Sequence, residues 1–382
     1  MEHKEPARIL VFGMTENPGG TESFLMNYYR HMDRDKIQFD FLANTLDNIA
    51  YEEELTAYGS RVFHIPPRRQ NRSAFYRELD RLFHRHANEW YAIWVNVSSL
   101  ANIDYLKAAK KYGIKKRIIH SHNSQNMDSK LRACLHLWNR TQVAKYATDF
   151  WACSEDAAKW FYTPDLMKQC IIVRNAIDTE RVRFDEEKRT AIRTEYGWPD
   201  KFVIGNVGRL HFQKNQKFII DIFQDFHAGH PDSVLVLVGH GEDETALKEQ
   251  AKNCGLTDSV FFAGVQSDIQ AWLSAFDFFL FPSKFEGLGI AALEAEANGL
   301  PVLASERVIP AEVKMNENLV FFPLDAGAEA WAARIAEMQG LGRLKYVDAK
   351  NAILDHGYDI ETEVRKLENA LLSEAGEANS ED

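Results

Sequence analysis

The stretch FPSKFEGLGIAALEAEANGLPVLAS, residues 281–305, decides the fold. It starts at the end of an apolar run, passes through a glycine-containing turn and an alanine-rich segment, and ends in a second apolar run, LPVLA. This order predicts a buried strand, a turn, a helix and a second strand. Ligands bind outside the carboxyl ends of strands in an open parallel sheet. The turn residues expected to meet a ligand are Glu286, Gly287, Leu288 and Gly289, and Glu294 follows about two helical turns along.

The same alternation of strand and helix extends over both halves of the chain. Upstream, apolar runs such as ARILVFG (7–13) and KRIIHSH (116–122) alternate with helical segments, and FVIGNVG (202–208) and VLVLVG (234–239) do so downstream. Such alternation predicts parallel, doubly wound sheets with right-handed crossovers. We interpret the polar segment AIDTERVRFDEEKRTAIRTEYGWPD, residues 176–200, as the passage between two α/β domains.

Length and composition favour a folded protein of two domains. A chain of 382 residues exceeds one ordinary core, and 45% of it is hydrophobic. We expect an N-terminal domain over 1–185, a C-terminal domain over 186–358, a helix over 359–373 that packs back toward the first domain, and a disordered acidic tail over 374–382. Two such domains would face each other across a cleft that holds a ligand.

Cysteine usage and the N-terminus favour the cytoplasm. The four cysteines are scattered and form no CxxC pair, so neither a disulfide framework nor a zinc site is expected. The N-terminus has no apolar signal region, and no apolar run approaches the roughly 20 residues that span a bilayer. An Asp-x-Asp pair, Asp33 and Asp35, precedes a strand and is interpreted as a solvated turn rather than a metal site.

The net charge of -11 is unevenly distributed along the sequence. The half up to Asp185 is slightly basic, with the runs RRQNR (68–72) and KYGIKKR (111–117), and the remainder is strongly acidic. The basic half could contact an anionic membrane surface, although solvated helix faces are the simpler interpretation. Nucleic acid is not an expected partner for so acidic a chain.

Two glycine-rich loops follow predicted strands, one in each half. In the first, Gly19 and Gly20 precede a helix, where backbone N–H groups and the helix dipole favour an anion. The spacing is not GxGxxG, so a dinucleotide is not indicated. In the second, Gly208 is followed by Arg209 and Lys214, two cations that suit a diphosphate. Considered without the rest of the sheet, these two residues are more simply interpreted as solvated. We favour a ligand site because their loop and the turn at Glu286 are expected at the same edge of the sheet.

Carboxylates in the opening stretch suit a ligand rich in hydroxyls. Glu286 and Glu294 could be solvent-facing, yet their surroundings are rich in alanine and other apolar residues. Carboxylates accept hydrogen bonds from vicinal hydroxyls, so the pair could hold a hexose and a ribose. Backbone N–H groups of Leu288 and Gly289 would point at a phosphate.

This combination resembles glycosyltransferase family 4, which consists of retaining enzymes of the GT-B fold that use nucleotide-sugar donors without a metal. The resemblance covers nearly the whole chain and is most specific in GNVGRLHFQKNQ (205–216), LVGHGEDE (237–244), FAGVQSDI (262–269) and the opening stretch. It is closest to bacterial enzymes that build capsular and extracellular polysaccharides, which carry stretches similar to HSHN (120–123) and ACSEDAA (152–158).

The resemblance implies roles for the residues already singled out. Glu286 would touch the donor sugar and Glu294 the ribose, while Arg209 and Lys214 would hold the diphosphate and stabilise the leaving group. Gly19 and Gly20 match a loop near the donor phosphate and the acceptor. The loop around Val265 would contact the base through its backbone groups.

A histidine pair ends one predicted strand of the N-terminal half. His120 and His122 lie two residues apart and can face the same way. Family members place a histidine near the donor sugar, and we favour His122, which Asn123 follows directly, with His120 as the alternative. At least one of the two is expected to be a structural, hydrogen-bonded histidine. A metal site would need a third ligand, and none is suggested.

The expected activity is transfer of a hexose from a nucleotide sugar, with UDP as the favoured nucleotide, to a saccharide or lipid-linked acceptor. Retention of configuration and independence of cofactors and metals follow from the resemblance. A nucleotide-sugar 2-epimerase of the same architecture is the alternative enzyme, and it would convert its donor without an acceptor. A two-domain solute-binding protein is the alternative from another class, but it would normally carry an export signal.

Overall fold

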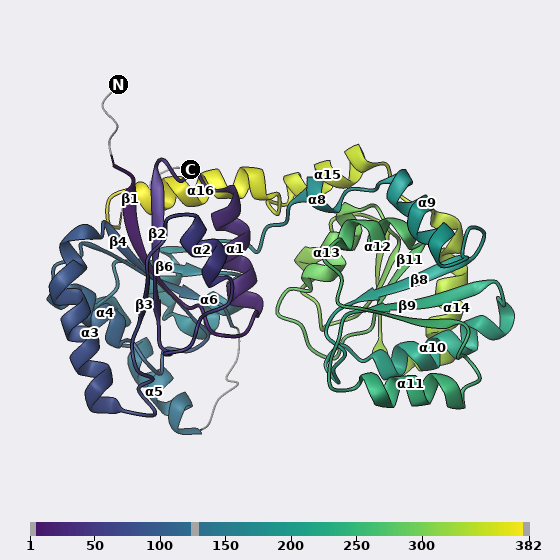
Figure 1. The fold of residues 1–382 in the computed structure, drawn as a ribbon, viewed down its shortest axis with the longest axis horizontal. Helices are drawn as coiled ribbons and strands as arrows, with labels where there is room; N and C mark the ends of the chain where they lie inside the picture. The colour runs from purple at the N-terminus through teal and green to yellow at the C-terminus, as the bar shows by residue number, and fades with distance from the viewer. Residues whose placement is uncertain (1–4, 124–129, 377–382) are drawn as a thin grey trace. The chain divides into compact units, whose positions relative to one another are not determined.

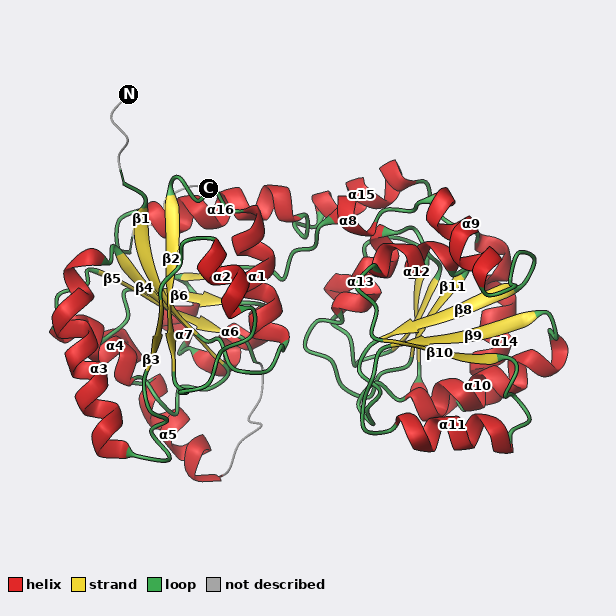
Figure 2. Cartoon of the chain, in the orientation of Figure 1, coloured by secondary structure: helices red, strands yellow, loops and turns green. Residues whose placement is uncertain are grey.

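A computed structural model describes residues 5–123 and 130–376. They divide into two compact units, unit 1 (residues 5–123, 130–176 and 360–376) and unit 2 (residues 177–359), each a parallel sheet with helices on both faces (Figures 1 and 2). The predicted doubly wound α/β architecture is therefore present in both units. The helix expected over 359–373 is α16 (Ile360–Leu372), and it packs against α1 (Gly20–His31) of unit 1. The predicted tail lies outside the described residues from position 377 onward.

Unit 1 contains a seven-stranded sheet with the order β3-β2-β1-β4-β5-β6-β7. Its strands are β1 (Ala7–Phe12), β2 (Ile37–Ala43), β3 (Val62–His64), β4 (Ala92–Val97), β5 (Lys116–Ser121), β6 (Asp149–Ala152) and β7 (Cys170–Ile172). Its further helices are α2 (Glu52–Ala57), α3 (Arg72–His86), η1 (Ala87–Glu89), α4 (Asp104–Lys111), α5 (Lys130–Arg140), η2 (Val143–Lys145), α6 (Glu155–Phe161) and α7 (Pro164–Met167).

Unit 2 contains a six-stranded sheet with the order β10-β9-β8-β11-β12-β13. Its strands are β8 (Phe202–Val207), β9 (Ser233–Val238), β10 (Val260–Gly264), β11 (Phe278–Phe281), β12 (Val302–Ser305) and β13 (Leu319–Phe322). Its helices are α8 (Thr179–Val182), α9 (Glu186–Glu195), α10 (Gln216–Gly229), α11 (Glu244–Asn253), α12 (Ile269–Ala275), α13 (Ile290–Ala297), η3 (Ala311–Val313), η4 (Leu324–Ala326), α14 (Ala328–Met338), η5 (Gln339–Leu341) and α15 (Tyr346–Asp355).

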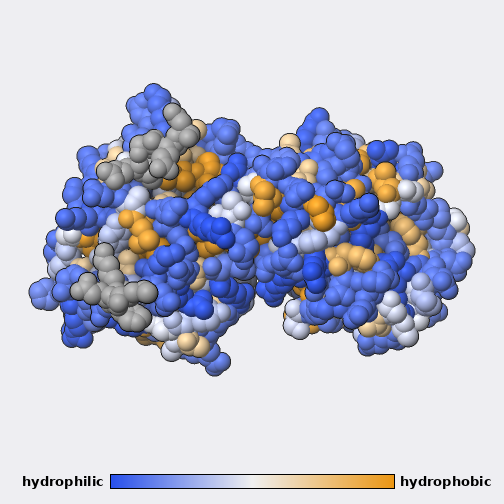
Figure 3. Space-filling view, turned by 90° about the horizontal axis from the view of Figure 1, so that it is seen from above, coloured by the Kyte–Doolittle hydropathy of each residue, from blue (hydrophilic) through white to orange (hydrophobic). Residues whose placement is uncertain are grey.

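The cores follow from the alternation of side chains along each strand. In β1, Ile9 and Val11 pack in the layer of α1 and α16, while Leu10 packs in the layer of α3 and α4. In β8, Val203 and Ile204 divide in the same way between two layers. Both faces of each sheet are buried, which explains the nearly continuous apolar runs of the strands. The surface seen in Figure 3 is by contrast mostly hydrophilic, with scattered hydrophobic residues.

The interpretation of residues 176–200 as a passage between domains was wrong, because this segment forms α8 and α9 of unit 2, and the division falls at Ala176 instead of Asp185. Two arginines of α9 bind the neighbouring segment from Ala275 to Asp277. Arg193 donates to the carbonyl of Ala275 (2.9 Å) and pairs with Asp277, which also pairs with Arg189. Arginines therefore attach α9 to unit 2, and the polar sequence of this segment is compatible with a packed helix.

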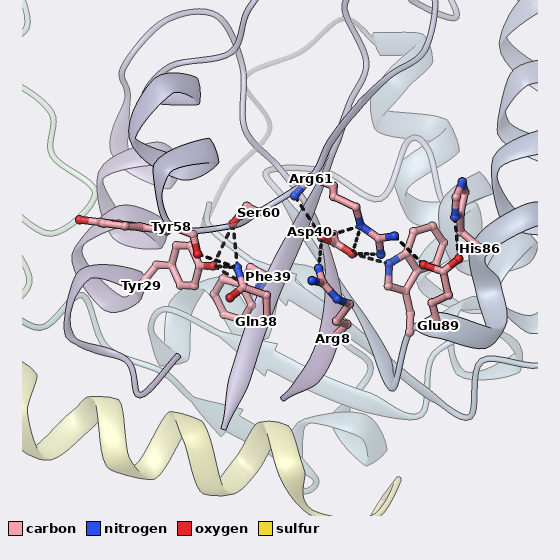
Figure 4. A network of polar contacts seen from close by, with 11 residues as sticks. Arg8, Tyr29, Gln38, Phe39, Asp40, Tyr58, Ser60, Arg61, His86 and Glu89 are labelled. Carbon is pink, nitrogen blue, oxygen red and sulfur yellow. Dashed lines mark hydrogen bonds and ion pairs between the residues drawn. The ribbon is translucent and has the colours of Figure 1, made fainter. Parts of the chain in front are cut away.

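A buried polar network joins the first strands of unit 1 (Figure 4). The carboxylate of Asp40 in β2 is fully buried and pairs with Arg8 (2.8 Å) and Arg61 (2.5 Å). It also accepts a hydrogen bond from the indole of Trp90 (3.0 Å). Three segments distant in sequence thus converge on one carboxylate, which fixes β1, β3 and the end of η1 relative to β2.

Candidate functional site

Unit 2 has its topological switch point between β8 and β11. Strand order runs outward from β8 to β9 and β10 on one side, and from β11 to β12 and β13 on the other. The loops after β8 and β11 therefore diverge from neighbouring strand ends, the place where open α/β sheets bind ligands. The predicted donor residues Gly208, Arg209 and Lys214 lie on the first loop, and Glu286 to Gly289 lie on the second.

Lys214 and Glu286 meet at this switch point. The Lys214 ammonium lies 2.7 Å from the Glu286 carboxylate, and their side chains are only 21% and 7% exposed. The ammonium also lies 5.1 Å from the centroid of the Phe281 ring. A cation and an anion are thus held together in a partly desolvated position at the edge of the sheet.

Backbone and amide contacts hold the two loops together around this pair. Lys284 N donates to Gln213 O (2.8 Å), and the Gln213 side chain donates to Phe285 O (2.9 Å). Asn215, in the left-handed region at φ 61°, donates from its side chain to Pro282 O (3.0 Å). The residues before and after Lys214 are therefore both held by hydrogen bonds to the loop after β11.

Helix α13 starts at this loop, as the opening stretch predicted. Its N-cap, Gly289, has φ 87°, a left-handed conformation that favours glycine. Leu288 beside it is buried and Gly287 is exposed. The free N–H groups of the first turn of α13 point along its axis toward the strand ends, so this end of the helix can accept an anion together with Lys214.

Glu294 lies on α13 in a half-buried position, and no hydrogen bond joins its carboxylate to the described residues. Burial raises the pKa of the Glu294 carboxyl to about 7, against a smaller opposite effect of Arg181. A partly exposed carboxyl without a hydrogen-bond partner among the described residues is suited to accept hydrogen bonds from a ligand's hydroxyls.

Arg209 does not join Lys214 in this structure. Its side chain is exposed and pairs with Glu242 (3.0 Å), which follows β9 and also lies 3.2 Å from the His211 imidazole. Exposed ion pairs contribute little to stability, so Arg209 can exchange this partner at little cost. Sequence reasoning assigned no role to Glu242, although the stretch LVGHGEDE contains it.

The loop after β9 lies directly against the loop after β8. A Cβ on Gly239 would come within 2.0 Å of Gly208 O, and one on Gly241 within 2.1 Å of Leu210 O. Only glycine allows this approach. Gly239 N also donates to Gly264 O (2.8 Å), next to the predicted base-contacting residue Val265, which is exposed at the end of β10.

Unit 1 has a second polar site at its own switch point, between β1 and β4. The loop after β1 ends at Gly19, the N-cap of α1, and Gly20 is the first residue of that helix. Both glycines are exposed. Glu22 fixes the loop, because its carboxylate accepts hydrogen bonds from the backbone N–H (3.0 Å) and the hydroxyl (2.7 Å) of Thr15. A cavity of about 440 Å³ opens here, and Gly20, Glu22, Asn44 and Asn96 are among its lining residues.

His122 contacts this site through Asn96. Its Nε2 lies 2.9 Å from Asn96 Oδ1, an acceptor, so Nε2 carries the proton and Nδ1 is left as an acceptor. Burial lowers the pKa of His122 to about 3, which keeps the imidazole neutral. Sequence reasoning missed Asn96, because its link to His122 crosses from β4 to the end of β5.

His120 points into the core instead. It is fully buried and stacks on Trp94, with 5.8 Å between ring centroids. Burial, and secondarily His122, keep the pKa of His120 well below its usual value. Neither ring nitrogen has a hydrogen-bond partner among the described residues. The structural histidine that we expected is thus His120 by position, although it lacks the expected hydrogen bond.

Asn123 lines a second cavity of unit 1, of about 310 Å³. Asn44, at the end of β2, lines both cavities, and its buried Oδ1 accepts no hydrogen bond from the described residues. A ligand hydroxyl could therefore donate to Asn44, a residue that sequence reasoning missed because a lone Asn after a strand is also typical of an ordinary turn.

Neither a metal cluster nor a membrane span is found in the described ranges. Across 5–123 and 130–376, no three His, Cys, Asp or Glu side chains gather as metal ligands. Asp33 pairs with Lys36 (2.9 Å) before β2, at the amino edge of the sheet. Of the helices in these ranges, none is both long enough and apolar enough to cross a bilayer.

Two adjoining loops of unit 2 thus bring a cation, a carboxylate and a helix N-terminus together at the strand ends of a doubly wound α/β unit, and comparisons with known proteins identify the family. Residues 188–342 match the family model described as Glycosyl transferases group 1. The putative glycosyltransferase EpsF of Bacillus subtilis is 31% identical over 360 residues, covering 92% of this chain and 93% of EpsF. The lipopolysaccharide core biosynthesis mannosyltransferase LpsB of Rhizobium meliloti is 31% identical over 140 residues, covering 35% of this chain and 40% of LpsB.

Solved structures show the same fold. Anabaena Alr3699/HepE in complex with UDP superposes with a TM-score of 0.74 at 19% identity, over 95% of this chain and 99% of that one. A glycosyltransferase from Rickettsia africae superposes with a TM-score of 0.78 at 15% identity, over 97% of this chain and all of that one. This chain belongs to the group 1 glycosyltransferases and has their GT-B fold, which confirms the family and fold predicted from the sequence.

Proposed function

We propose that this glycosyltransferase moves a hexose from UDP-sugar to a saccharide or lipid-linked saccharide acceptor, with retention of anomeric configuration and without a metal ion or other cofactor. The observation that carries the proposal is the Lys214–Glu286 pair at the β8–β11 switch point, 2.7 Å apart. In this proposal the protein acts in polysaccharide synthesis, in the cytoplasm or at the inner face of the membrane.

In this proposal, different residues of unit 2 bind the diphosphate, the two sugars and the base of the donor. Lys214 and the first turn of α13 attract the diphosphate, and Arg209 joins them after leaving Glu242. Glu286 accepts hydrogen bonds from the hexose and Glu294 from the ribose, and the ribose hydroxyls give the half-buried Glu294 carboxyl its hydrogen-bond partners. Backbone groups around Val265 contact the base.

Catalysis in this proposal depends on charge stabilisation. Departure of the nucleoside diphosphate leaves an oxocarbenium-like sugar, and the charge that develops on the leaving phosphate is stabilised by cations and N–H groups already in place. Lys214 is fixed by contacts on both sides along the chain, so it needs little reorganisation. Retention would follow from attack on the same face, with the leaving phosphate taking the acceptor's proton.

In unit 1, Gly19, Gly20, His122 and Asn123 contribute to the acceptor and donor-phosphate region. The neutral imidazole of His122, oriented by Asn96, offers Nδ1 as an acceptor for a sugar hydroxyl. The choice of UDP follows the complexes named for HepE, which contain UDP, UDP with glucose, and UDP-glucose. The choice of pathway follows LpsB, which is named for lipopolysaccharide core biosynthesis.

Product analysis tests the proposal. The protein is incubated with UDP-, GDP- and ADP-sugars and an acceptor panel in EDTA, followed by mass spectrometry and by NMR of the anomeric configuration. A thermal-shift screen selects the donor, since a ligand at 100 times its dissociation constant adds about 2.7 kcal/mol of stability. Conversion of the donor without any acceptor would indicate an epimerase, and a requirement for a divalent metal would contradict the proposed mechanism.

Two variants separate the roles within the pair. Lys214→Met should lower transfer by about 100-fold or more and weaken binding of UDP itself, because it removes diphosphate stabilisation. Glu286→Gln should lower transfer while binding of UDP persists, because UDP has no hexose. Lys217→Met, an exposed position in the first turn of α10, is the matched control and should transfer at the wild-type rate. Wild-type transfer by folded Lys214→Met and Glu286→Gln proteins would refute the assignment.

A further inference from the structure

Helix α5 of unit 1 is built with its polar side inward. Its buried residues are His136 and Asn139. Its outward side carries Leu131, Cys134, Leu135, Leu137 and Trp138, all exposed. Among the described residues, four of the twelve exposed large hydrophobic side chains lie on this helix of 11 residues. A helix on a protein surface normally turns its apolar stripe toward the core, so this reversal needs an explanation.

Polar contacts are sufficient to attach α5 to unit 1. Leu100 N donates to His136 Nδ1 (3.0 Å), so the opposite nitrogen, Nε2, is the protonated one and donates to Trp160 O (3.2 Å). Asn139 donates to Leu100 O (2.7 Å), and Arg140 donates to Tyr162 O (3.0 Å). The fold therefore makes no use of the leucines and the tryptophan on the other side.

The outward residues form a continuous apolar face. Leu131, Leu135 and Trp138 follow the spacing i, i+4, i+7 that lines one side of a helix, and Cys134 lies between them. We call these four residues the α5 apolar face. Leu131 is 72% exposed and Trp138 is 67% exposed, so a large part of this surface is in contact with solvent.

Exposed lysines lie near the α5 apolar face. From Lys130 to Thr148 the sequence contains no Asp or Glu, and the exposed Lys130 and Lys145 lie within this stretch. The neighbouring helix α4 adds more, because Lys110 donates to Lys145 O (2.6 Å) and its ammonium lies 5.6 Å from the centroid of the Tyr146 ring. A helix with apolar residues on one side and lysines at its borders is typical of segments that lie in a membrane interface.

The position of α5 within unit 1 fits such a role. Arg132 lines the cavity of about 310 Å³ together with Asn102 and Tyr105, so the helix adjoins the carboxyl edge of the sheet. Within unit 1, α5 lies at the end opposite α16 in both ribbon views (Figures 1 and 2). A molecule anchored in a bilayer beneath α5 could present its polar group to this cavity.

We propose that the α5 apolar face docks on an anionic lipid bilayer, with Leu131 and Trp138 inserted among the headgroups and the exposed lysines nearby, Lys110, Lys130 and Lys145, against lipid phosphates. The charges argue against a second copy of the chain as the occupant. A two-fold contact would place the same face on itself and bring the flanking cations together, whereas an anionic surface neutralises them.

Vesicle binding tests this proposal without reference to transfer activity. The full chain should cosediment with vesicles of phosphatidylcholine containing about 30% phosphatidylglycerol, and less so with neutral vesicles or at high salt. Leu131→Ser/Trp138→Ser should lower partitioning by about tenfold or more, because both apolar anchors are lost. The matched control is Val347→Ser/Leu354→Ser, which changes two exposed apolar residues of α15 and should bind as wild type.

A probe on Cys134 reports insertion directly. An environment-sensitive fluorophore on this exposed cysteine should shift its emission to the blue on anionic vesicles, and a Cys134→Ser protein labelled in parallel should lack that shift. Equal partitioning of wild type and Leu131→Ser/Trp138→Ser overturns the proposal, as does failure of the wild type to bind. A wild-type dimer that Leu131→Ser/Trp138→Ser dissociates, seen by light scattering, would assign the face to a second copy instead and also overturn it.

Discussion

Replacing Glu294 by Gln should remove a pH dependence from donor binding. Burial places the pKa of the Glu294 carboxyl at about 7 in the free protein, above the ordinary value of 4.5. Hydroxyl groups that donate to a carboxylate favour its ionised form. If the ribose binds as proposed, the donor selects the ionised form and a proton is released on binding.

The size of the effect follows from the fraction of ionised protein. A pKa near 7 leaves about one-tenth of the molecules ionised at pH 6, about half at pH 7 and about nine-tenths at pH 8. The apparent dissociation constant varies inversely with the competent fraction. Donor affinity should therefore rise by about tenfold from pH 6 to pH 8 in the wild type and stay nearly constant in Glu294→Gln.

Isothermal titration calorimetry is the suitable assay, with UDP-glucose as the ligand. Its diphosphate is esterified at both ends, so its charge is constant over this range, unlike that of UDP. Repeating each titration in buffers of different ionisation enthalpy counts the protons released, about 0.9 per donor at pH 6 and about 0.5 at pH 7. The same affinity profile in wild type and Glu294→Gln would refute the assignment of this carboxyl to the donor.

Three further substitutions test the framework around the sites, each by urea unfolding. Asp40→Ala should lower the free energy of unfolding by about 3–5 kcal/mol, because it leaves two arginines without their buried carboxylate. Gly289→Ala should cost about 1–2 kcal/mol through its left-handed backbone, and should also reduce transfer by displacing the start of α13. Lys116→Met should cost about 3 kcal/mol, because it removes the donor to Ala370 O and Ser373 O at the end of α16 and the cation that lies 3.6 Å from the Asp149 carboxylate, and hydrogen exchange should show α16 opening first. Lys36→Met, at an exposed position, should stay within about 0.5 kcal/mol of wild type in the same measurements.

Local pattern was sufficient to predict much of the fold and the positions of the loops. Strands buried on both faces appear as short apolar runs, and the glycines at their ends indicate turns. Both signals are local in sequence and do not depend on tertiary contacts. The helix after Gly289 and the loop from Gly208 to Lys214 lie where these local signals placed them. Residues 176–200 were misinterpreted because α9 is held by arginines that reach the carbonyls of α12, and such contacts leave no apolar periodicity.

The sequence alone could not predict which side chains of different loops contact each other. Arg209 and Lys214 lie five residues apart and looked equivalent, yet one meets Glu242 and the other Glu286. Which carboxylate each cation meets depends on strand order, since β9 and β11 flank β8 on opposite sides. The orientation of His122 likewise depends on Asn96, from the strand next to its own.

The Lys214–Glu286 pair has a consequence for how a donor enters. In the absence of a ligand, the two charges neutralise each other at a position where either one alone would be costly to desolvate. A nucleotide sugar can satisfy both at once, with its phosphate taking the ammonium and its hydroxyls taking the carboxylate, whereas a nucleotide without a sugar satisfies only Lys214. The binding free energy of the sugar is therefore coupled to that of the phosphate. When the phosphate takes Lys214, Glu286 loses its partner, and the sugar hydroxyls must replace it. If the donor binds as proposed, this coupling makes the ion pair favour the intact donor over its product, and release of the nucleotide after transfer becomes easier.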